Sequence, residues 1–154
     1  WSKNEKSEIR NPLATRPWQH VLEPLSGYIS LIVKLSKNEE LNGEAFNFGP
    51  PANQNHTVEE LVEEIIMHWP QSEWINKSPA GGQLHEAGLL KLNCDKALHA
   101  LGWQATLNFK ETAKWTADWY RMYYDDPNMI ADTTYKQIQD YTDLAKKRGS
   151  FIFR

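Results

Sequence analysis

The chain has 154 residues, enough for one domain with its own core and too few for two domains of ordinary size. Hydrophobic residues make up 40% of it and the net charge is −3, as in a globular protein rather than a disordered one. Its 17 basic and 20 acidic side chains give no reason to expect nucleic-acid binding, and no apolar run approaches the roughly 20 residues of a membrane helix. The single cysteine, Cys94, fits a reducing compartment. We therefore expect a cytoplasmic protein.

Hydrophobic periodicity predicts two or three short strands and five helices, an α/β or α+β chain weighted toward helix. The first predicted elements are an extended segment at 7–10, a helix at 21–36 and a strand at 44–48 that ends before Gly49-Pro50-Pro51. Along the helix at 21–36, apolar side chains recur at helical spacing and predict a single apolar face.

The remaining predicted elements begin at capping residues and stop at glycines. Thr57 with Glu60, and Asn108 with Glu111, have the spacing of capping boxes, in which each side chain bonds the backbone amide of the other residue. Gly102 follows a helical pattern and favours the left-handed conformation that ends a helix. In chain order these elements are a helix at 57–69, a short strand at 73–76, a loop at 79–82, a short helix capped by Asn93, a helix from 108 that ends before Pro127, and a last helix at 133–148 stopped by Gly149.

The sequence contains none of the common catalytic, cofactor or metal motifs. Neither GxGxxG nor GxxxxGK[ST] occurs, and no lysine lies four residues after a tyrosine. The histidines are never three or four residues apart, and one cysteine cannot build a structural zinc site. We therefore expect no catalytic, cofactor-binding or metal-binding residue in this chain.

Two segments are candidates for ligand binding. In Arg16-Pro17-Trp18-Gln19-His20-Val21, at the start of a predicted helix, the arginine offers a bidentate fork to a phosphate. The alternative is that Arg16 is a solvated loop cation and Trp18 a core anchor. In the glycine-containing loop at 78–86, His85 is placed to donate a hydrogen bond to an oxyanion, and the alternative is a plain surface connection.

The same two segments carry a family resemblance. The stretch from Ile9 to Leu25, with Arg-Pro-Trp-Gln-His-Val at its centre, resembles the signature of the CDP-glucose 4,6-dehydratases. These enzymes are NAD-dependent members of the extended short-chain dehydrogenase family. Further stretches similar to that family follow in the same order, namely Phe46-Asn47-Phe48-Gly49-Pro50, His85-Glu86-Ala87, Leu90-Lys91-Leu92-Asn93-Cys94-Asp95-Lys96 and Leu101-Gly102-Trp103.

The resemblance covers the C-terminal part of such an enzyme and implies an α/β fold. It implies a helix-rich substrate-binding portion with a few short strands, in which 22–48 supplies an edge helix and strand of the Rossmann sheet. The NAD-binding domain would precede this chain and is absent from it. The reaction implied is that of a lyase: C4 of the hexose is oxidised by hydride transfer to NAD, water is eliminated across C5–C6, and the hydride returns to C6. The family's role is in nucleotide-sugar and polysaccharide biosynthesis, and we expect this chain alone to be inactive and to bind no NAD.

The resemblance also implies substrate-binding roles for three residues. Arg16 resembles the arginine that related enzymes place on the substrate diphosphate. His85 matches the loop histidine near the nucleotide, and Glu86 is a weaker candidate for the same pocket. Related dTDP-glucose enzymes have arginines after that histidine, where this chain has Ala87-Gly88-Leu89, a difference that agrees with another base.

Two alternatives to CDP-glucose dehydration are open. One is the same part of another sugar-nucleotide epimerase or dehydratase, and the other is a non-enzymatic module that binds a nucleotide sugar or a protein. Because Leu25, Ile29 and Ile32 would lose their neighbours without the rest of the enzyme, we expect this face to meet another copy, a retained N-terminal domain or a rearranged part of the chain.

Overall fold

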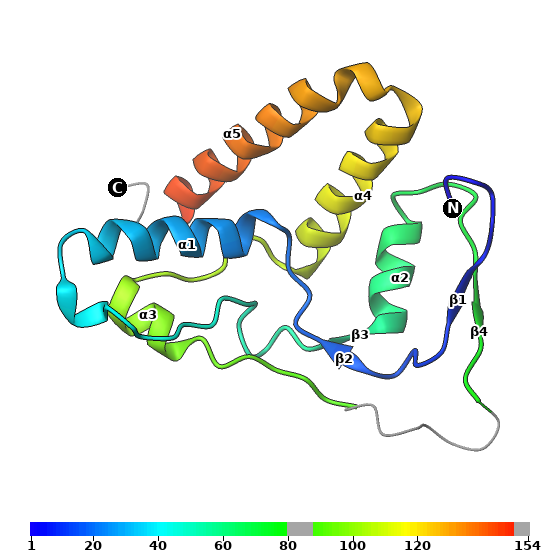
Figure 1. Ribbon diagram of the computed structural model, residues 1–154. Helices are drawn as coiled ribbons and strands as arrows, with labels where there is room; N and C mark the ends of the chain where they lie inside the picture. Colours follow the sequence, from blue (N-terminus) through cyan, green and yellow to red (C-terminus); the bar gives the residue numbers. More distant parts are fainter. Residues whose placement is uncertain (80–87, 150–154) are drawn as a thin grey trace.

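The computed structural model describes residues 1–79 and 88–149. It is helix-rich with a few short strands, as the periodicity predicts (Figure 1). The helices are α1 (Leu22–Leu35), α2 (Val58–Ile66), α3 (Asp95–Leu101), α4 (Phe109–Asp125) and α5 (Ile130–Arg148), with 3-10 turns η1 (Glu39–Leu41) and η2 (Pro127–Met129). The strands are β1 (Ser7–Ile9), β2 (Thr15–Arg16), β3 (His56–Thr57) and β4 (Trp74–Asn76). None of these helices combines the length and the apolar character that crossing a membrane requires.

The strands form two small two-stranded ladders. β1 pairs in parallel with β4, with Ser7 opposite Trp74, and β2 pairs antiparallel with β3, with Arg16 opposite His56. The predicted strand at 44–48 is wrong. These residues are all described and form no ladder, because a strand requires a neighbour to receive its backbone hydrogen bonds and no described segment supplies one.

Local helix signals agree well with the structure. Both predicted capping boxes are present, and the Thr57 hydroxyl accepts from the Glu60 amide at 3.1 Å. Gly102 and Gly149 end α3 and α5 with φ of 70° and 84°. The predicted cap of α3 is shifted by one residue: Cys94 occupies the N-cap position, and the Asn93 side chain instead accepts from the Asp95 amide at 2.9 Å.

Helix packing places α4 and α5 as an antiparallel pair, with α2 against α4 and α3 beneath α1 (Figure 1). Two clusters of buried side chains hold these elements together. One consists of Phe48, Ala97, Leu101 and Trp103, and the other of Leu107, Tyr141 and Ala145. Gly27 lets α1 approach the first cluster, because a Cβ at this position would lie 2.3 Å from the Phe48 ring.

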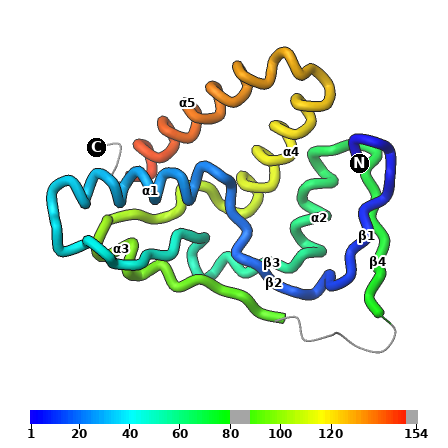
Figure 2. Tube along the Cα trace, in the orientation of Figure 1, coloured from blue at the N-terminus to red at the C-terminus, as the bar shows by residue number. Residues whose placement is uncertain are grey.

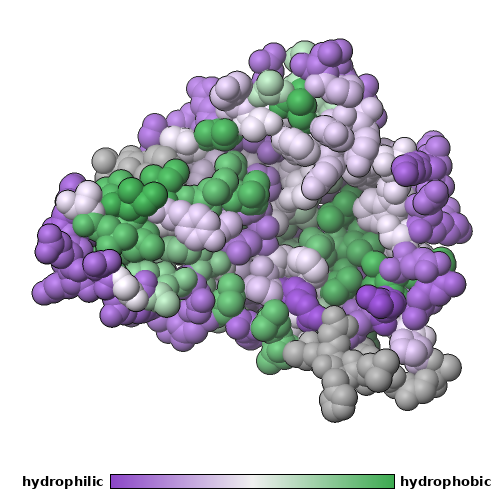
Figure 3. Space-filling model, viewed as in Figure 1, coloured by the Kyte–Doolittle hydropathy of each residue, from purple (hydrophilic) through white to green (hydrophobic). Residues whose placement is uncertain are grey.

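The first helix has its apolar side outward. Its buried residues are polar or small, namely Glu23, Ser26, Gly27 and Ser30. Leu25, Ile29 and Ile32 are 45%, 52% and 64% exposed, and apolar side chains gather on the surface over α1 (Figure 3). Because no described residue buries this face, rearrangement within the described chain does not cover it. Contact with another copy or with an N-terminal domain remains a prediction.

Candidate functional site

Arg16 lies on a short, well-held strand. Because Pro17 follows Arg16, extended backbone is favoured at Arg16. In the antiparallel ladder of β2 and β3, Arg16 lies opposite His56. The Trp18 indole N–H donates to the His56 carbonyl at 3.0 Å, which adds a side-chain bond to this ladder. The Arg16 guanidinium donates to the carbonyl of Thr15 at 2.8 Å. The strand therefore fixes the backbone from which the Arg16 side chain extends.

The residues after Trp18 have structural contacts. The Gln19 amide donates to the Phe48 carbonyl at 3.0 Å, which ties this segment to the first core cluster. His20 is 5% exposed, and its Nδ1 accepts from the Leu22 amide at 3.3 Å, at the start of α1. Burial lowers the pKa of His20 to about 4, so the ring is neutral at pH 7. Within the predicted segment, Gln19 and His20 are thus held by contacts within the fold.

Gly88 and Leu89, which follow the predicted 78–86 loop, lie beside β2. Thr15 donates to the Gly88 carbonyl through its amide at 2.9 Å, and it forms a parallel bridge with Leu89. His85 and Glu86 lie outside the described residues, so their predicted roles stay predictions. Gly88, two positions after Glu86, is thus bonded to Thr15, the residue that precedes Arg16.

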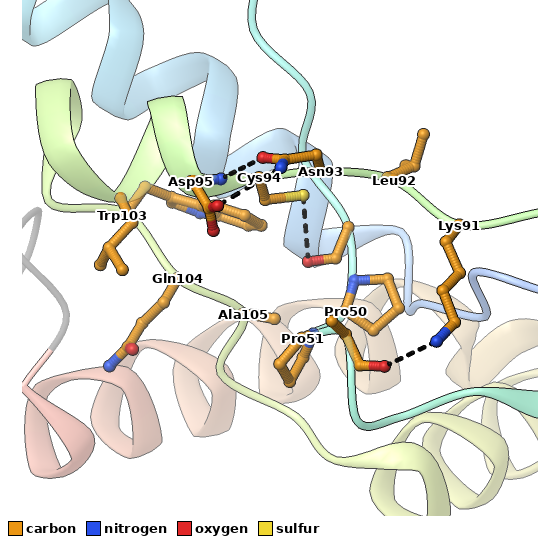
Figure 4. A pocket seen from close by; sticks show the side chains of 13 residues that line it. Pro50, Pro51, Lys91, Leu92, Asn93, Cys94, Asp95, Trp103, Gln104 and Ala105 are labelled. Carbon is orange, nitrogen blue, oxygen red and sulfur yellow. Dashed lines mark hydrogen bonds between the residues drawn. The ribbon is translucent and has the colours of Figure 1, made fainter.

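Arg16 shares a small hollow with a second cation. This hollow lies between the 50–55 loop and residues 90–92, and Lys91 is among the residues that line it. The Lys91 ammonium donates to the Ala52 carbonyl at 3.3 Å and so links the two walls (Figure 4). The segments that form these walls run side by side along the chain trace (Figure 2). Arg16 and Lys91 thus both border this hollow, whose volume is about 10 Å³.

A larger cavity of about 470 Å³ continues from this hollow. Both are bounded by Pro50, Pro51 and Ala52 on one side and by Lys91 and Leu92 on the other. The cavity extends to the start of α3 and to the loop after it, and its further lining residues are Gly49, Asn93, Cys94, Asp95, Leu98, Trp103, Gln104 and Ala105 (Figure 4). Its size falls in the range of small-ligand sites.

The cavity has the chemistry of a binding site. Burial raises the pKa of the Cys94 thiol above its ordinary value, so the thiol is protonated at pH 7 and is a weak nucleophile. The Cys94 Sγ lies 3.8 Å from the Gly49 carbonyl, to which it donates. Over the part of the chain that the structure describes, no three His, Cys, Asp or Glu side chains lie close enough to hold a metal ion. The cavity is lined mainly by uncharged residues, with Lys91 and Asp95 as its charged ones.

Sequence reasoning missed His56 and Lys91 as neighbours of Arg16. The His56 ring stacks on Phe109 with centroids 3.7 Å apart, and its Nδ1 lies 3.3 Å from a Glu60 carboxylate oxygen. Lys91 falls within a stretch that carries the family resemblance, but its spacing from Arg16 indicates no contact. A pairing between residues so far apart in sequence has no local signal.

Comparisons with known proteins agree with the resemblance. No family model matches the chain. Over 142 residues, 92% of its length, the chain is 35% identical to CDP-glucose 4,6-dehydratase from Salmonella typhimurium. It spans 39% of that protein's length, a share that fits a C-terminal part. The chain is thus similar to CDP-glucose 4,6-dehydratase over nearly all of its own length.

Proposed function

We propose that this chain is the C-terminal, substrate-binding part of an NAD-dependent sugar-nucleotide 4,6-dehydratase that converts CDP-glucose to CDP-4-keto-6-deoxyglucose. The proposal rests on the similarity to CDP-glucose 4,6-dehydratase and on one structural observation. Arg16, the residue that the resemblance assigns to the diphosphate, lies with Lys91 at a hollow that continues into a cavity of about 470 Å³. In this proposal the cations hold the diphosphate, and the cavity holds an uncharged part of the nucleotide sugar. His85 and Glu86 are proposed for the same pocket.

The described residues do not fit NAD. Binding of its pyrophosphate requires a glycine-rich turn that leads from a strand into a helix N-terminus. The helix that follows a strand directly, α2, begins after His56-Thr57, and no glycine precedes it in that turn. We therefore assign NAD to the rest of the enzyme, and we assign binding and orientation of the substrate to this chain.

Substitution of Arg16 in a full-length dehydratase that contains this chain tests the assignment. We expect Arg16→Ala to weaken CDP-glucose binding by about 10- to 150-fold, because it removes charge-assisted hydrogen bonds worth about 1.5–3 kcal/mol. Arg16→Lys should recover part of the loss, since an ammonium cannot reproduce the bidentate fork. NAD affinity should change little. Isothermal titration calorimetry measures both ligands.

The matched control is Arg10→Ala, which removes an exposed arginine from the same N-terminal segment. It should leave CDP-glucose affinity unchanged. Equal affinity in the wild type and Arg16→Ala would reject the Arg16 site and leave the family relationship intact. Tighter binding of another nucleotide sugar than of CDP-glucose would instead support a related epimerase or dehydratase.

We also propose that 22–48 lies at the edge of the dehydratase's Rossmann sheet, with the exposed face of α1 packed against the NAD-binding domain. Full burial of an isoleucine contributes about 1.5–3 kcal/mol. Ile32 is 64% exposed in the single chain. We therefore expect Ile32→Ser to cost less than about 0.5 kcal/mol in the 154-residue chain and about 1.5–3 kcal/mol in the full-length enzyme.

Urea unfolding of both proteins measures this difference. Leu13→Ser is the control, because Leu13 is 70% exposed and is not part of α1. Equal small effects of Ile32→Ser in the two proteins would show that the NAD-binding domain does not cover this face.

A further inference from the structure

The inward side of α1 carries a buried carboxylate that binds the loop after α3. Glu23 is 1% exposed. Its two oxygens accept from the Thr106 amide at 3.0 and 2.9 Å, and one of them accepts from the Leu107 amide at 2.6 Å. These bonds join α1 to a loop more than 80 positions away in sequence. A carboxylate accepts several hydrogen bonds at once, which suits this arrangement.

A second residue of α1 holds the other end of the same loop. The Trp103 indole N–H donates to the Ser26 hydroxyl oxygen at 2.8 Å, and Ser26 lies one helical turn beyond Glu23. Trp103 is 1% exposed. The segment from 103 to 107 is thus bonded to α1 near both of its ends.

This loop forms one wall of the candidate binding cavity. Trp103, Gln104 and Ala105 line the cavity (Figure 4). Trp103 is one anchor, and Gln104 and Ala105 lie between it and the second anchor at Thr106. The same loop is also held from α5, because the Arg148 guanidinium donates to the Thr106 carbonyl and pairs with Glu111 at 2.7 Å. Trp103 is also held from α3, because its amide donates to the Ala97 carbonyl at 3.2 Å.

We propose that Glu23 and Ser26 are positioning residues for the substrate: they hold the 103–107 loop at α1 and so set the shape of the cavity that binds the nucleotide sugar. The inference rests on the proposed function for its ligand. It also accounts for the inverted character of α1. The polar inward face of α1 supplies the hydrogen-bond acceptors that the loop needs. Burying a carboxylate costs free energy, and the hydrogen bonds that Glu23 accepts from the backbone amides and the Tyr141 hydroxyl offset that cost.

Tyr141 provides a matched control within the same network. Its hydroxyl donates to the Glu23 carboxylate at 2.9 Å and lies 2.9 Å from the Ser26 oxygen. It comes from α5. Its side chain also contacts Thr106 and Leu107, whereas the residues of the loop that line the cavity are Trp103, Gln104 and Ala105. Tyr141→Phe therefore removes a buried hydrogen bond from Glu23 while leaving the Thr106 and Leu107 amides bonded. It should lower stability without altering the cavity.

The experiment compares Glu23→Gln, Ser26→Ala and Tyr141→Phe in the full-length enzyme, at a temperature where each variant is folded. Glu23→Gln places an amide where two backbone N–H groups need an acceptor. We expect it to speed hydrogen exchange at the Thr106 and Leu107 amides and to weaken CDP-glucose binding about tenfold. Ser26→Ala should weaken binding by a smaller factor through Trp103. Tyr141→Phe should lower the melting temperature and leave affinity within about twofold of wild type.

The outcomes separate this inference from the proposed function. If the wild type binds no CDP-glucose, the proposed function fails. The positioning role is tested separately by hydrogen exchange: if exchange at the Thr106 and Leu107 amides is as slow in Glu23→Gln as in the wild type, the positioning role is rejected. If the wild type binds and Glu23→Gln binds equally well, the positioning role is rejected alone. Equal losses of affinity in Glu23→Gln and Tyr141→Phe would also reject it, since they would reflect general destabilisation. Should Glu23→Gln fail to fold, unchanged affinity in Ser26→Ala is the rejecting result.

Discussion

Replacing Trp103 with alanine is expected to lower the free energy of unfolding by about 3–5 kcal/mol, the usual cost of removing a large buried aromatic side chain. Trp103 is 1% exposed and packs edge-on against Phe48 with ring centroids 4.9 Å apart. Its neighbours Ala97 and Leu101 are fully buried. The substitution leaves a cavity between α1, α3 and the 103–107 loop, in the cluster that these neighbours form with Phe48.

Two further variants identify the cause of that loss. Trp103→Phe keeps an aromatic ring but removes the donor to Ser26, and should cost about 1–3 kcal/mol. Tyr135→Ala removes an aromatic side chain that is 73% exposed and should change stability by less than about 0.5 kcal/mol. Urea unfolding followed by circular dichroism measures all three. A loss below 1 kcal/mol for Trp103→Ala would show that this cluster is not a core.

The second large effect is a loss of stability in acid caused by His20. Burial lowers the pKa of His20 from 6.5 to about 4 in the folded chain. Between these values the unfolded state binds more protons than the folded state, so stability falls as the pH falls from 6.5 to about 4. At 1.36 kcal/mol per pH unit, the full loss is about 3 kcal/mol. Protonation of Nδ1 also removes the acceptor that the Leu22 amide uses at the start of α1.

Comparing the unfolding free energies of the wild type and a His20 variant separates the contribution of His20 to the pH dependence of stability from that of Glu23. Burial raises the pKa of Glu23, so its contribution has the opposite sign: it is present below the ordinary value of 4.5 and is lost as the pH rises through the raised pKa. Unfolding free energies of wild type and His20→Gln, measured from pH 8 to pH 4, should diverge in slope below pH 6.5. Leu13→Ser, at an exposed position with no titratable side chain, is the control and should keep the wild-type slope. Parallel curves for wild type and His20→Gln would contradict the prediction.

Features that depend on neighbouring residues could be read from the sequence. The capping boxes at Thr57 and Asn108 involve partners three residues away, and the glycine that ends α3 requires only its own positive φ. Family similarity was likewise visible in short stretches such as the one around Arg16, because it depends on residue identity and order. These features need no knowledge of how distant segments pack.

The position of the site and the direction of α1 could not be read in this way. Periodicity established that α1 is amphipathic, but the structure turns its polar side inward, where Glu23 and Ser26 bond the 103–107 loop. Similarly, a strand at 44–48 was favoured by composition but has no partner among the described residues.

The sequence by itself determined the approximate extent of the helices, the two capping boxes and the similarity to CDP-glucose 4,6-dehydratase, because each depends on contiguous residues. Only the tertiary structure decided that Arg16 and Lys91 border one hollow, and that a buried carboxylate on α1 holds a wall of the adjoining cavity. The physical reason is that hydrogen bonds and packing between distant segments depend on the arrangement of the whole chain, which no local pattern specifies.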